Sequence, residues 1–86
     1  MSYDVKVLPS AAKDLRRLPN DMVSRLHSTL GNLREQPRPV GSQKLVNVHP
    51  ETWRVRVGDW RVLYRVNDEL KMVYVVTVAH RREVYR

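Results

Sequence analysis

Apolar and polar side chains alternate at the start of the chain, and this period of two residues predicts a short β-strand. The alternating residues are Tyr3, Asp4, Val5, Lys6 and Val7. Pro9 interrupts the pattern, because proline cannot donate a hydrogen bond to a neighbouring strand. We therefore expect the first element to end before Pro9.

The next segment has an apolar residue at every third or fourth position, which predicts two helices. The first is expected from Ser10, as its N-cap, to Leu18, and the segment Pro19–Asp21 ends it. The second is expected from Asn20, as its cap, to about Glu35. Its apolar stripe consists of Met22, Val23, Leu26, Leu30 and Leu33. Because the break between the helices is short, they should form an antiparallel helical hairpin.

Pro37, Pro39 and Gly41 mark an irregular linker that runs to about Gln43. Alternation then predicts strands over residues 53–57 and 60–66, joined by a two-residue loop. Residues 67–69 form a second turn, and the apolar run 72–78 predicts a central strand that is covered on both faces. The predicted fold is α+β, with an N-terminal strand, a helical hairpin, a three-stranded antiparallel meander and a short basic C-terminal tail.

The first hairpin has a defined register if Gly58 and Asp59 form its whole loop, because Val57 then faces Trp60 and Arg56 faces Arg61. One face of the sheet is apolar and should lie under the helices; it consists of Trp53, Val55, Val57, Trp60, Val62, Tyr64 and Val66. The other face carries Arg54, Arg56, Arg61 and Arg65. If the second turn has an even-numbered loop, this arginine face also receives Tyr74, Val76, Val78 and His80.

Length and composition restrict the classes of protein. A chain of 86 residues has material for a single core, so we expect one domain over residues 1–86. The absence of cysteine excludes a disulfide framework, a thiolate metal site and a cysteine nucleophile. No apolar run approaches the ~20 residues that cross a bilayer, and the first segment lacks a secretory signal, so we expect a cytoplasmic protein without a membrane partner.

The charge of the chain favours a polyanionic partner. Sixteen basic residues against nine acidic ones give a formal net charge of +7, and twelve of the sixteen are arginines. A guanidinium group binds phosphate oxygens in a bidentate manner, whereas an ammonium group acts as a point charge. Contact with phosphate is therefore favoured over a role in solubility alone, and the polyanionic partner is either nucleic acid or an acidic protein, although arginines that only solvate the surface would give the same composition.

Cleavage of RNA by its own 2′-hydroxyl suits this set of residues and needs no metal. The reaction requires stabilisation of a phosphorane-like state, a proton acceptor and a proton donor. Arg56, Arg61 and Arg81 can stabilise charge, and His80 and Tyr85 are the titratable candidates, although a solvated histidine and a packed tyrosine are the simpler interpretation. A glycine-rich phosphate loop, a metal-ligand spacing and a Ser-His-Asp set are lacking, so we expect no cofactor and no metal.

Two segments, WRVRVGDWRVLYRV over residues 53–66 and HRREVY over residues 80–85, follow the predicted helical hairpin in order. In this arrangement the chain resembles the RelE/ParE superfamily of bacterial and archaeal toxins. The resemblance implies a RelE-like fold and the toxin half of a type II toxin–antitoxin system. It further implies a ribosome-dependent mRNA interferase, an endoribonuclease that cuts translated mRNA in the A site and inhibits translation. The implied partners are a cognate antitoxin, in a hetero-oligomer, and the ribosome with its mRNA.

The resemblance also implies site residues. By matched position, catalysis falls on Arg54, Arg56, Arg61, Arg81 and Tyr85. The best-known RelE members carry lysines where this chain has Arg54 and Arg56, and arginine is a poor proton acceptor, so His80 becomes the preferred base. The residues expected to add attraction for RNA are Lys44, Arg65, Arg82 and Arg86.

Two alternatives stay open. ParE-like members of the same superfamily bind DNA gyrase and need no RNA-cleaving residues, although Arg61, Arg81 and Tyr85 favour the nuclease. The chain could also be a non-catalytic module that binds nucleic acid or an acidic protein, whose affinity falls steeply with salt and which leaves RNA unchanged. An assay of the product separates these functions.

Overall fold

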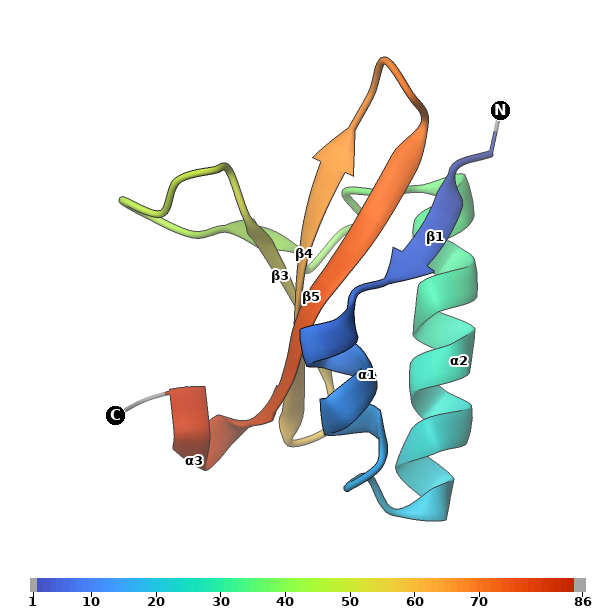
Figure 1. Cartoon of the computed structure of the whole chain (residues 1–86), viewed down its shortest axis with the longest axis vertical. Coiled ribbons are helices and arrows are strands. Elements are labelled where there is room, and N and C mark those ends of the chain that lie inside the picture. The colour runs from blue at the N-terminus through green and yellow to red at the C-terminus, as the bar shows by residue number, and fades with distance from the viewer. Residues whose placement is uncertain (1, 85–86) are drawn as a thin grey trace.

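The computed structural model describes residues 2–84, with Glu83 and Val84 described by their backbone alone. In chain order its elements are β1 (Asp4–Val7), α1 (Pro9–Leu15), α2 (Asn20–Glu35), β2 (Gln43–Lys44), β3 (Trp53–Val57), β4 (Trp60–Asn67), β5 (Met72–His80) and α3 (Arg81–Val84). The strands form one sheet in the order β1-β5-β4-β3-β2, and α1 and α2 lie against one of its faces (Figure 1). The predicted α+β class is confirmed.

β5 is central, as predicted, since it pairs with β1 in parallel and with β4 antiparallel. The expectation that β5 is covered on both faces is wrong, because both long helices lie on the same side and Tyr74 stays half-buried on the other. β2 was not predicted, and it extends the sheet by pairing with β3. None of the helices in residues 2–84 has the length and apolar character that crossing a bilayer requires.

The two long helices run in opposite directions, as the predicted hairpin requires (Figure 1). α1 begins two residues earlier than expected, because Pro9 takes its first position, where the missing N–H has no helical acceptor to lose. The prediction of Ser10 as N-cap is therefore wrong; Leu8 has that position, and the Ser10 hydroxyl donates to the carbonyl of Val76 at 2.6 Å. α1 also ends at Leu15 instead of Leu18.

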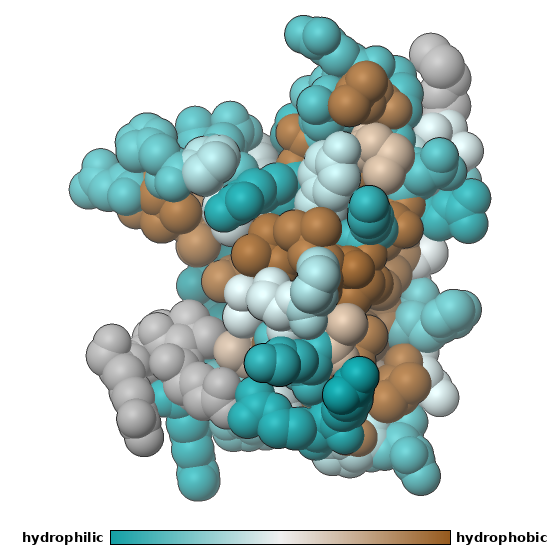
Figure 2. All heavy atoms as spheres, in the orientation of Figure 1, coloured by the Kyte–Doolittle hydropathy of each residue, from teal (hydrophilic) through white to brown (hydrophobic). Residues whose placement is uncertain are grey.

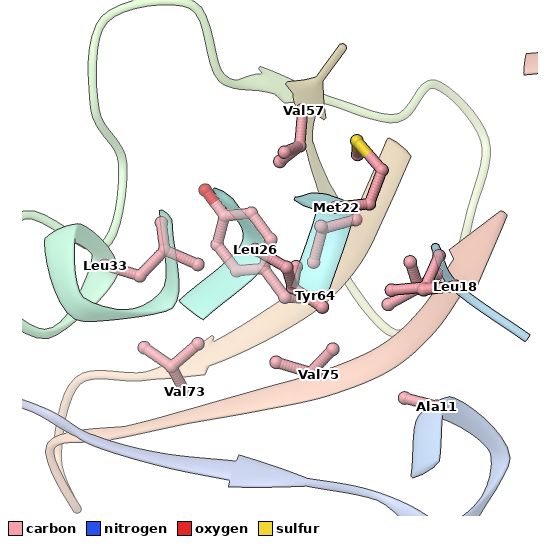
Figure 3. Close-up of a cluster of buried hydrophobic side chains, with 11 residues drawn as sticks. Ala11, Leu18, Met22, Leu26, Leu33, Val57, Tyr64, Val73 and Val75 are labelled. Carbon is pink, nitrogen blue, oxygen red and sulfur yellow. The ribbon is translucent and has the colours of Figure 1, made fainter. Parts of the chain in front are cut away.

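α2 has the predicted bounds, but Pro19 takes the cap position and Asn20 is the first helical residue. The core lies between the sheet and the two helices α1 and α2 (Figure 3). Leu33 and Tyr64 are fully buried there. Val23, which was placed on the apolar stripe, is 45% exposed, because the stripe that faces the sheet is narrower than the predicted one.

The register of the first hairpin is confirmed in all five pairs, including Val57 with Trp60 and Arg56 with Arg61. Tyr64 lies on the apolar face of this hairpin, where its buried hydroxyl donates to the carbonyl of Pro37 at 2.7 Å. Burial raises the pKa of this hydroxyl above its usual value. The predicted apolar face therefore does carry the helices.

In the second hairpin, some side chains of β5 lie on the opposite face of the sheet from the one predicted. The loop of this hairpin spans residues 68–71 and so has the even length that was assumed. A β-bulge follows, however, since Leu63 pairs with Thr77 whereas Tyr64 pairs with Val75. The bulge on β5 adds one residue and moves every later side chain to the other face.

Tyr74 lies on the arginine face as predicted, opposite Arg65. Beyond the bulge, Val78 lies opposite Val62 and His80 opposite Trp60. The prediction that Val78 and His80 share the arginine face is therefore wrong, because they belong to the face that the helices cover.

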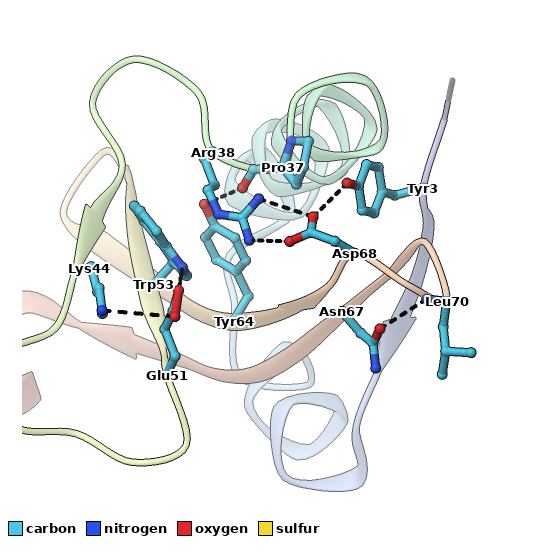
Figure 4. A network of polar contacts seen from close by, with 10 residues as sticks. All are labelled: Tyr3, Pro37, Arg38, Lys44, Glu51, Trp53, Tyr64, Asn67, Asp68 and Leu70. Carbon is cyan, nitrogen blue, oxygen red and sulfur yellow. Dashed lines mark hydrogen bonds and ion pairs between the residues drawn. The ribbon is translucent and has the colours of Figure 1, made fainter.

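A polar network ties the linker after α2 to the end of the sheet where β4 turns into β5 (Figure 4). Arg38 donates from Nη1 and Nη2 to the two carboxylate oxygens of Asp68, at 3.2 and 2.9 Å. Tyr3 donates its hydroxyl to Oδ1 of Asp68 at 2.6 Å, and the guanidinium of Arg38 lies 5.4 Å from the ring centre of Trp53. These contacts connect Tyr3, directly before β1, with the linker, β3 and the β4–β5 loop.

Candidate active site

Three arginines meet at the opposite end of the sheet, where β3 turns into β4. They line a cavity of about 130 Å³, whose lining residues are Arg56, Gly58, Asp59, Trp60, Arg61 and Arg81. Arg56 and Arg61 arrive as a cross-strand pair, and Arg81 opens α3 directly after β5. Like charges that face each other across strands repel, so an anion between these groups would be favourable. Figure 2 shows a largely hydrophilic surface at this end of the molecule.

The three arginines differ in burial. Arg61 is only 4% exposed, whereas the side chain of Arg81 is 62% exposed and Arg56 is also exposed. The prediction that Arg61 lies on an open cationic face, outside the buried interior, is therefore wrong. A buried guanidinium acts in a medium of lower dielectric constant, where its attraction for a phosphate is stronger than in water.

The turn between β3 and β4 depends on glycine. Gly58 has φ +61°, a left-handed conformation, and a Cβ atom there would lie 2.9 Å from Nη1 of Arg25. Arg25 comes from α2, so a helix side chain packs directly against this turn. The sequence pattern gave no indication of Arg25, because an exposed helical arginine carries no local signal of a tertiary contact.

Asp59 completes the turn, as predicted, and also joins it to α3. Its carbonyl accepts the backbone N–H of Arg81 at 2.7 Å. Its carboxylate oxygen Oδ1 lies 3.9 Å from Nη1 of Arg81. The position of Arg81 therefore depends on the β3–β4 turn as well as on β5.

A second hollow adjoins the cavity and is lined by Asp59, His80, Arg81 and Arg82. The ring of His80 meets that of Trp60 edge to face, with centroids 5.3 Å apart. Its Nδ1 accepts the backbone N–H of Arg82 at 3.3 Å, so the proton of neutral His80 resides on Nε2. Although His80 lies on the other face of the sheet, it shares this hollow with Arg81.

The other site residues predicted on the strands lie outside the cavity, at separate places on the sheet. Arg54 donates to Oε1 of Gln43 and lines a separate hollow together with Arg56. Arg65 donates from Nε to the hydroxyl of Thr52 at 3.4 Å, farther along β4. Lys44 lies in β2, with Nζ 3.8 Å from Oε2 of Glu51. The structure therefore does not bring Lys44 or Arg65 to the cavity.

Tyr85 and Arg86 lie outside the described residues. Within the described part of the chain, no three histidine, aspartate or glutamate side chains come together as ligands for a metal ion. The chemistry that the described residues offer is therefore the binding of an anion by several guanidinium groups beside an imidazole N–H.

Comparison with known proteins identifies the family. Residues 5–85 match the model of the ParE toxin of the type II toxin–antitoxin system, parDE. Toxin RelG of Mycobacterium tuberculosis (strain ATCC 25618 / H37Rv) is 33% identical over 87 residues, which cover 100% of this chain and 99% of that toxin.

Two solved structures are similar over nearly their full length. The archaeal RelE–RelB complex from Pyrococcus horikoshii OT3 contains a chain with a TM-score of 0.82 and 29% identity, covering 94% of this chain and 97% of that one. The toxin–antitoxin complex RelBE2 from Mycobacterium tuberculosis gives 0.83 and 28%, covering 93% and 99%. Fold and sequence thus define a toxin of a type II toxin–antitoxin system. The chain belongs to the RelE/ParE superfamily, which confirms the resemblance and the RelE-like fold it implied.

Proposed function

We propose that this toxin is a metal-independent endoribonuclease that cleaves translated mRNA in the ribosomal A site and so inhibits translation. The observation that carries the proposal is the convergence of Arg56, Arg61 and Arg81 on one cavity. Such a group of guanidiniums suits a phosphate that gains negative charge during the reaction.

In the proposed reaction the 2′-hydroxyl of a nucleotide gives its proton to a base and attacks the adjacent phosphorus. The bond from phosphorus to the 5′-oxygen of the next nucleotide breaks, and this oxygen takes up a proton, so that a 2′,3′-cyclic phosphate and a 5′-hydroxyl form. Arg61 is buried before substrate arrives, so little rearrangement is needed when charge develops. Arg56 and Arg81, which are exposed, would close on the phosphate as it binds. Arg54 extends the cationic surface along β3, and Arg82 extends it along the second hollow.

Proton transfer in this reaction is assigned to His80 and Tyr85. With Nδ1 engaged by Arg82, His80 presents an N–H donor from Nε2 and accepts a proton only after that contact opens. His80 therefore serves best as a hydrogen-bond donor to the phosphate or leaving oxygen in the described state. Tyr85 is the other titratable candidate.

We also propose a cognate antitoxin as the protein partner, in a hetero-oligomer, with the ribosome and its mRNA as the targets in the cytoplasm. This part rests on relatives: the RelE of Pyrococcus horikoshii and the RelBE2 toxin were solved in complexes with their antitoxins. The formal net charge of +7 suits an acidic or polyanionic surface on each of these partners.

The test is to express the chain in bacteria and to map the 5′ ends of one reporter transcript, made in translatable and untranslatable forms. New ends within codons of the translated form alone are the expected result. Arg81→Ala is the matched inactive control, because its exposed side chain can be removed with little effect on folding. Intact transcripts in both forms would refute the nuclease.

Inhibition of DNA gyrase is the second candidate, and the match of residues 5–85 to the ParE family model favours it. It predicts growth arrest with intact transcripts and a loss of supercoiling by gyrase in vitro. A purely binding module would change neither the transcripts nor the supercoiling.

A further inference from the structure

Asp59 has an unusual place among the cations of the candidate site. It lies where the two hollows meet, because it lines both of them. Among the described residues that line these hollows, it alone carries a carboxylate; the others include Arg56, Arg61, Arg81 and Arg82. An RNA phosphate that enters the cavity therefore meets a fixed negative charge beside the positive ones.

The carboxylate of Asp59 is directed at one of these arginines. Oδ1 lies 3.9 Å from Nη1 of Arg81, and the two side chains are 70% and 62% exposed. An ion pair this exposed contributes little to the stability of a fold. Its effect on a ligand is different, because the same guanidinium cannot give its full attraction to a phosphate while a carboxylate is beside it.

The main chain holds Asp59 in this position. Its carbonyl accepts the N–H of Arg81 at 2.7 Å, and the preceding Gly58 packs against the guanidinium of Arg25. A negative charge on an anchored turn stays near Arg81 when a ligand arrives, so the competition persists.

We propose that Asp59 is a specificity-determining residue, an internal anion that competes with RNA phosphates for Arg81 and weakens the binding of RNA that engages Arg81 alone. RNA that contacts Arg56 and Arg61 as well as Arg81 gains from these two further guanidiniums the attraction that Asp59 removes at Arg81. The inference rests on the proposed function in one respect, namely that the cavity binds RNA phosphates.

The test measures binding without cleavage. The probe is a short fluorescent 2′-O-methyl RNA, which lacks the attacking hydroxyl, and its Kd is measured by anisotropy at low salt. Asp59→Asn keeps the size of the side chain and the backbone hydrogen bond to Arg81. We expect Asp59→Asn to bind about fivefold more tightly than the unaltered chain, and the gain to fade as salt rises.

Glu69→Gln is the matched control. It makes the same change in net charge, but it lies in the β4–β5 loop, at the other end of β4 from Asp59. Its Kd should stay within about twofold of the unaltered chain, since the distance exceeds the range of an exposed charge. A gain equal to that of Asp59→Asn would show a general charge effect and overturn the proposal.

A double-mutant cycle with Arg81→Ala tests whether Asp59 acts on RNA binding through Arg81. If Asp59 acts through Arg81, the gain from Asp59→Asn disappears in the Arg81→Ala background. A gain that persists there, an unchanged or weaker Kd for Asp59→Asn, or no binding by any of the proteins overturns the inference. The expected gain together with intact transcripts in the mapping experiment would refute the nuclease and leave the inference standing.

Discussion

At the end of the sheet where β4 turns into β5, Arg38 donates from two nitrogens to Asp68, and both charges are matched (Figure 4). At the other end, where β3 turns into β4, Arg56, Arg61 and Arg81 line one cavity. Both ends combine arginine, aspartate and aromatic side chains. The difference between them is therefore the ratio of charges, since Asp68 binds a single arginine, whereas Asp59 lines a cavity together with three.

The electrostatics of the two ends differ accordingly. Hydrogen bonds from Arg38 and Tyr3 lower the pKa of Asp68 to about 2, and Asp68 in turn raises the pKa of Arg38. This end uses its charges to hold segments of the chain together. At the other end the positive charges of Arg56 and Arg81 are exposed to solvent, and such charges attract a polyanion. The two ends therefore differ in what their arginines do: Arg38 stabilises the fold, whereas Arg56 and Arg81 are placed to bind an anionic ligand.

The strongest test of this separation is Arg81→Ala. Loss of one charge-stabilising donor should lower the rate of mRNA cleavage by about a hundred- to a thousandfold. Thermal unfolding should change little, because the side chain is 62% exposed. Cleavage is measured by primer extension on a transcript translated in vitro. Full activity with a normal melting curve would remove Arg81 from the site.

Arg61→Ala should affect cleavage and stability together. Because Arg61 is only 4% exposed, its removal leaves space in a packed region, at a cost of about 1–3 kcal/mol in the free energy of unfolding. Arg61→Lys keeps the charge and much of the packing, so it should recover most of the stability but not the bidentate contact. Urea denaturation measures the first effect and primer extension the second. If Arg61→Ala unfolds at the same urea concentration as the unaltered chain, the buried position is not structurally important.

Arg38→Ala should lower the stability of the fold and leave cleavage unchanged, which is the reverse of the effect expected for Arg81→Ala. Arg38→Ala removes a bidentate contact with Asp68 and the stacking on Trp53, which together are worth about 1 kcal/mol at an exposed site. The midpoint of urea unfolding should fall, and cleavage at a temperature where the variant is folded should be unchanged. A loss of cleavage in fully folded Arg38→Ala would break the distinction between the two ends.

The smallest expected effect is a change in how the stability of the fold depends on pH. The pKa of Asp68 is about 2 in the folded protein, below its ordinary value of 3.8, so the ionised form is bound more tightly by the fold. Its contribution to stability is full above pH ~5 and is lost as pH falls through about 4 to 2. Asp68→Asn should therefore unfold more easily than the unaltered chain at pH 6, and most of the difference should be lost by pH 2. A difference in the urea midpoint that stays constant over this range would contradict the assignment.

Local patterns predicted the first hairpin well. The register around Gly58 and Asp59 depends on a two-residue loop and on alternation in the strands it joins, and both are visible in the sequence. The second hairpin required the pairing of distant residues. A bulge at Val76 cannot be seen in an apolar run such as Met72–Val78, because every residue there suits either face.

Predictions that considered one residue at a time were wrong in two places, the start of α1 and the burial of Arg61. Ser10 suits an N-cap, but Pro9 beside it is better suited to the first helical position and shifts the start of α1. Arg61 has the alternation of a solvent-facing residue, yet it is buried. Arg61 lies opposite Ala79 of β5 and lines a cavity with Arg81, and no pattern around Arg61 records this proximity.

The sequence by itself determined the α+β class, the apolar face under the helices, the cross-strand pair of Arg56 and Arg61, and the basic character of the chain. These properties follow from periodicity and charge, which are local or additive along the chain. Only the tertiary structure decided that Arg61 is buried, that His80 lies opposite Trp60, and that Arg25 and Asp59 border the turn. Those properties depend on a bulge and on packing between residues far apart in the chain, where free energy is set by contacts that no local pattern encodes.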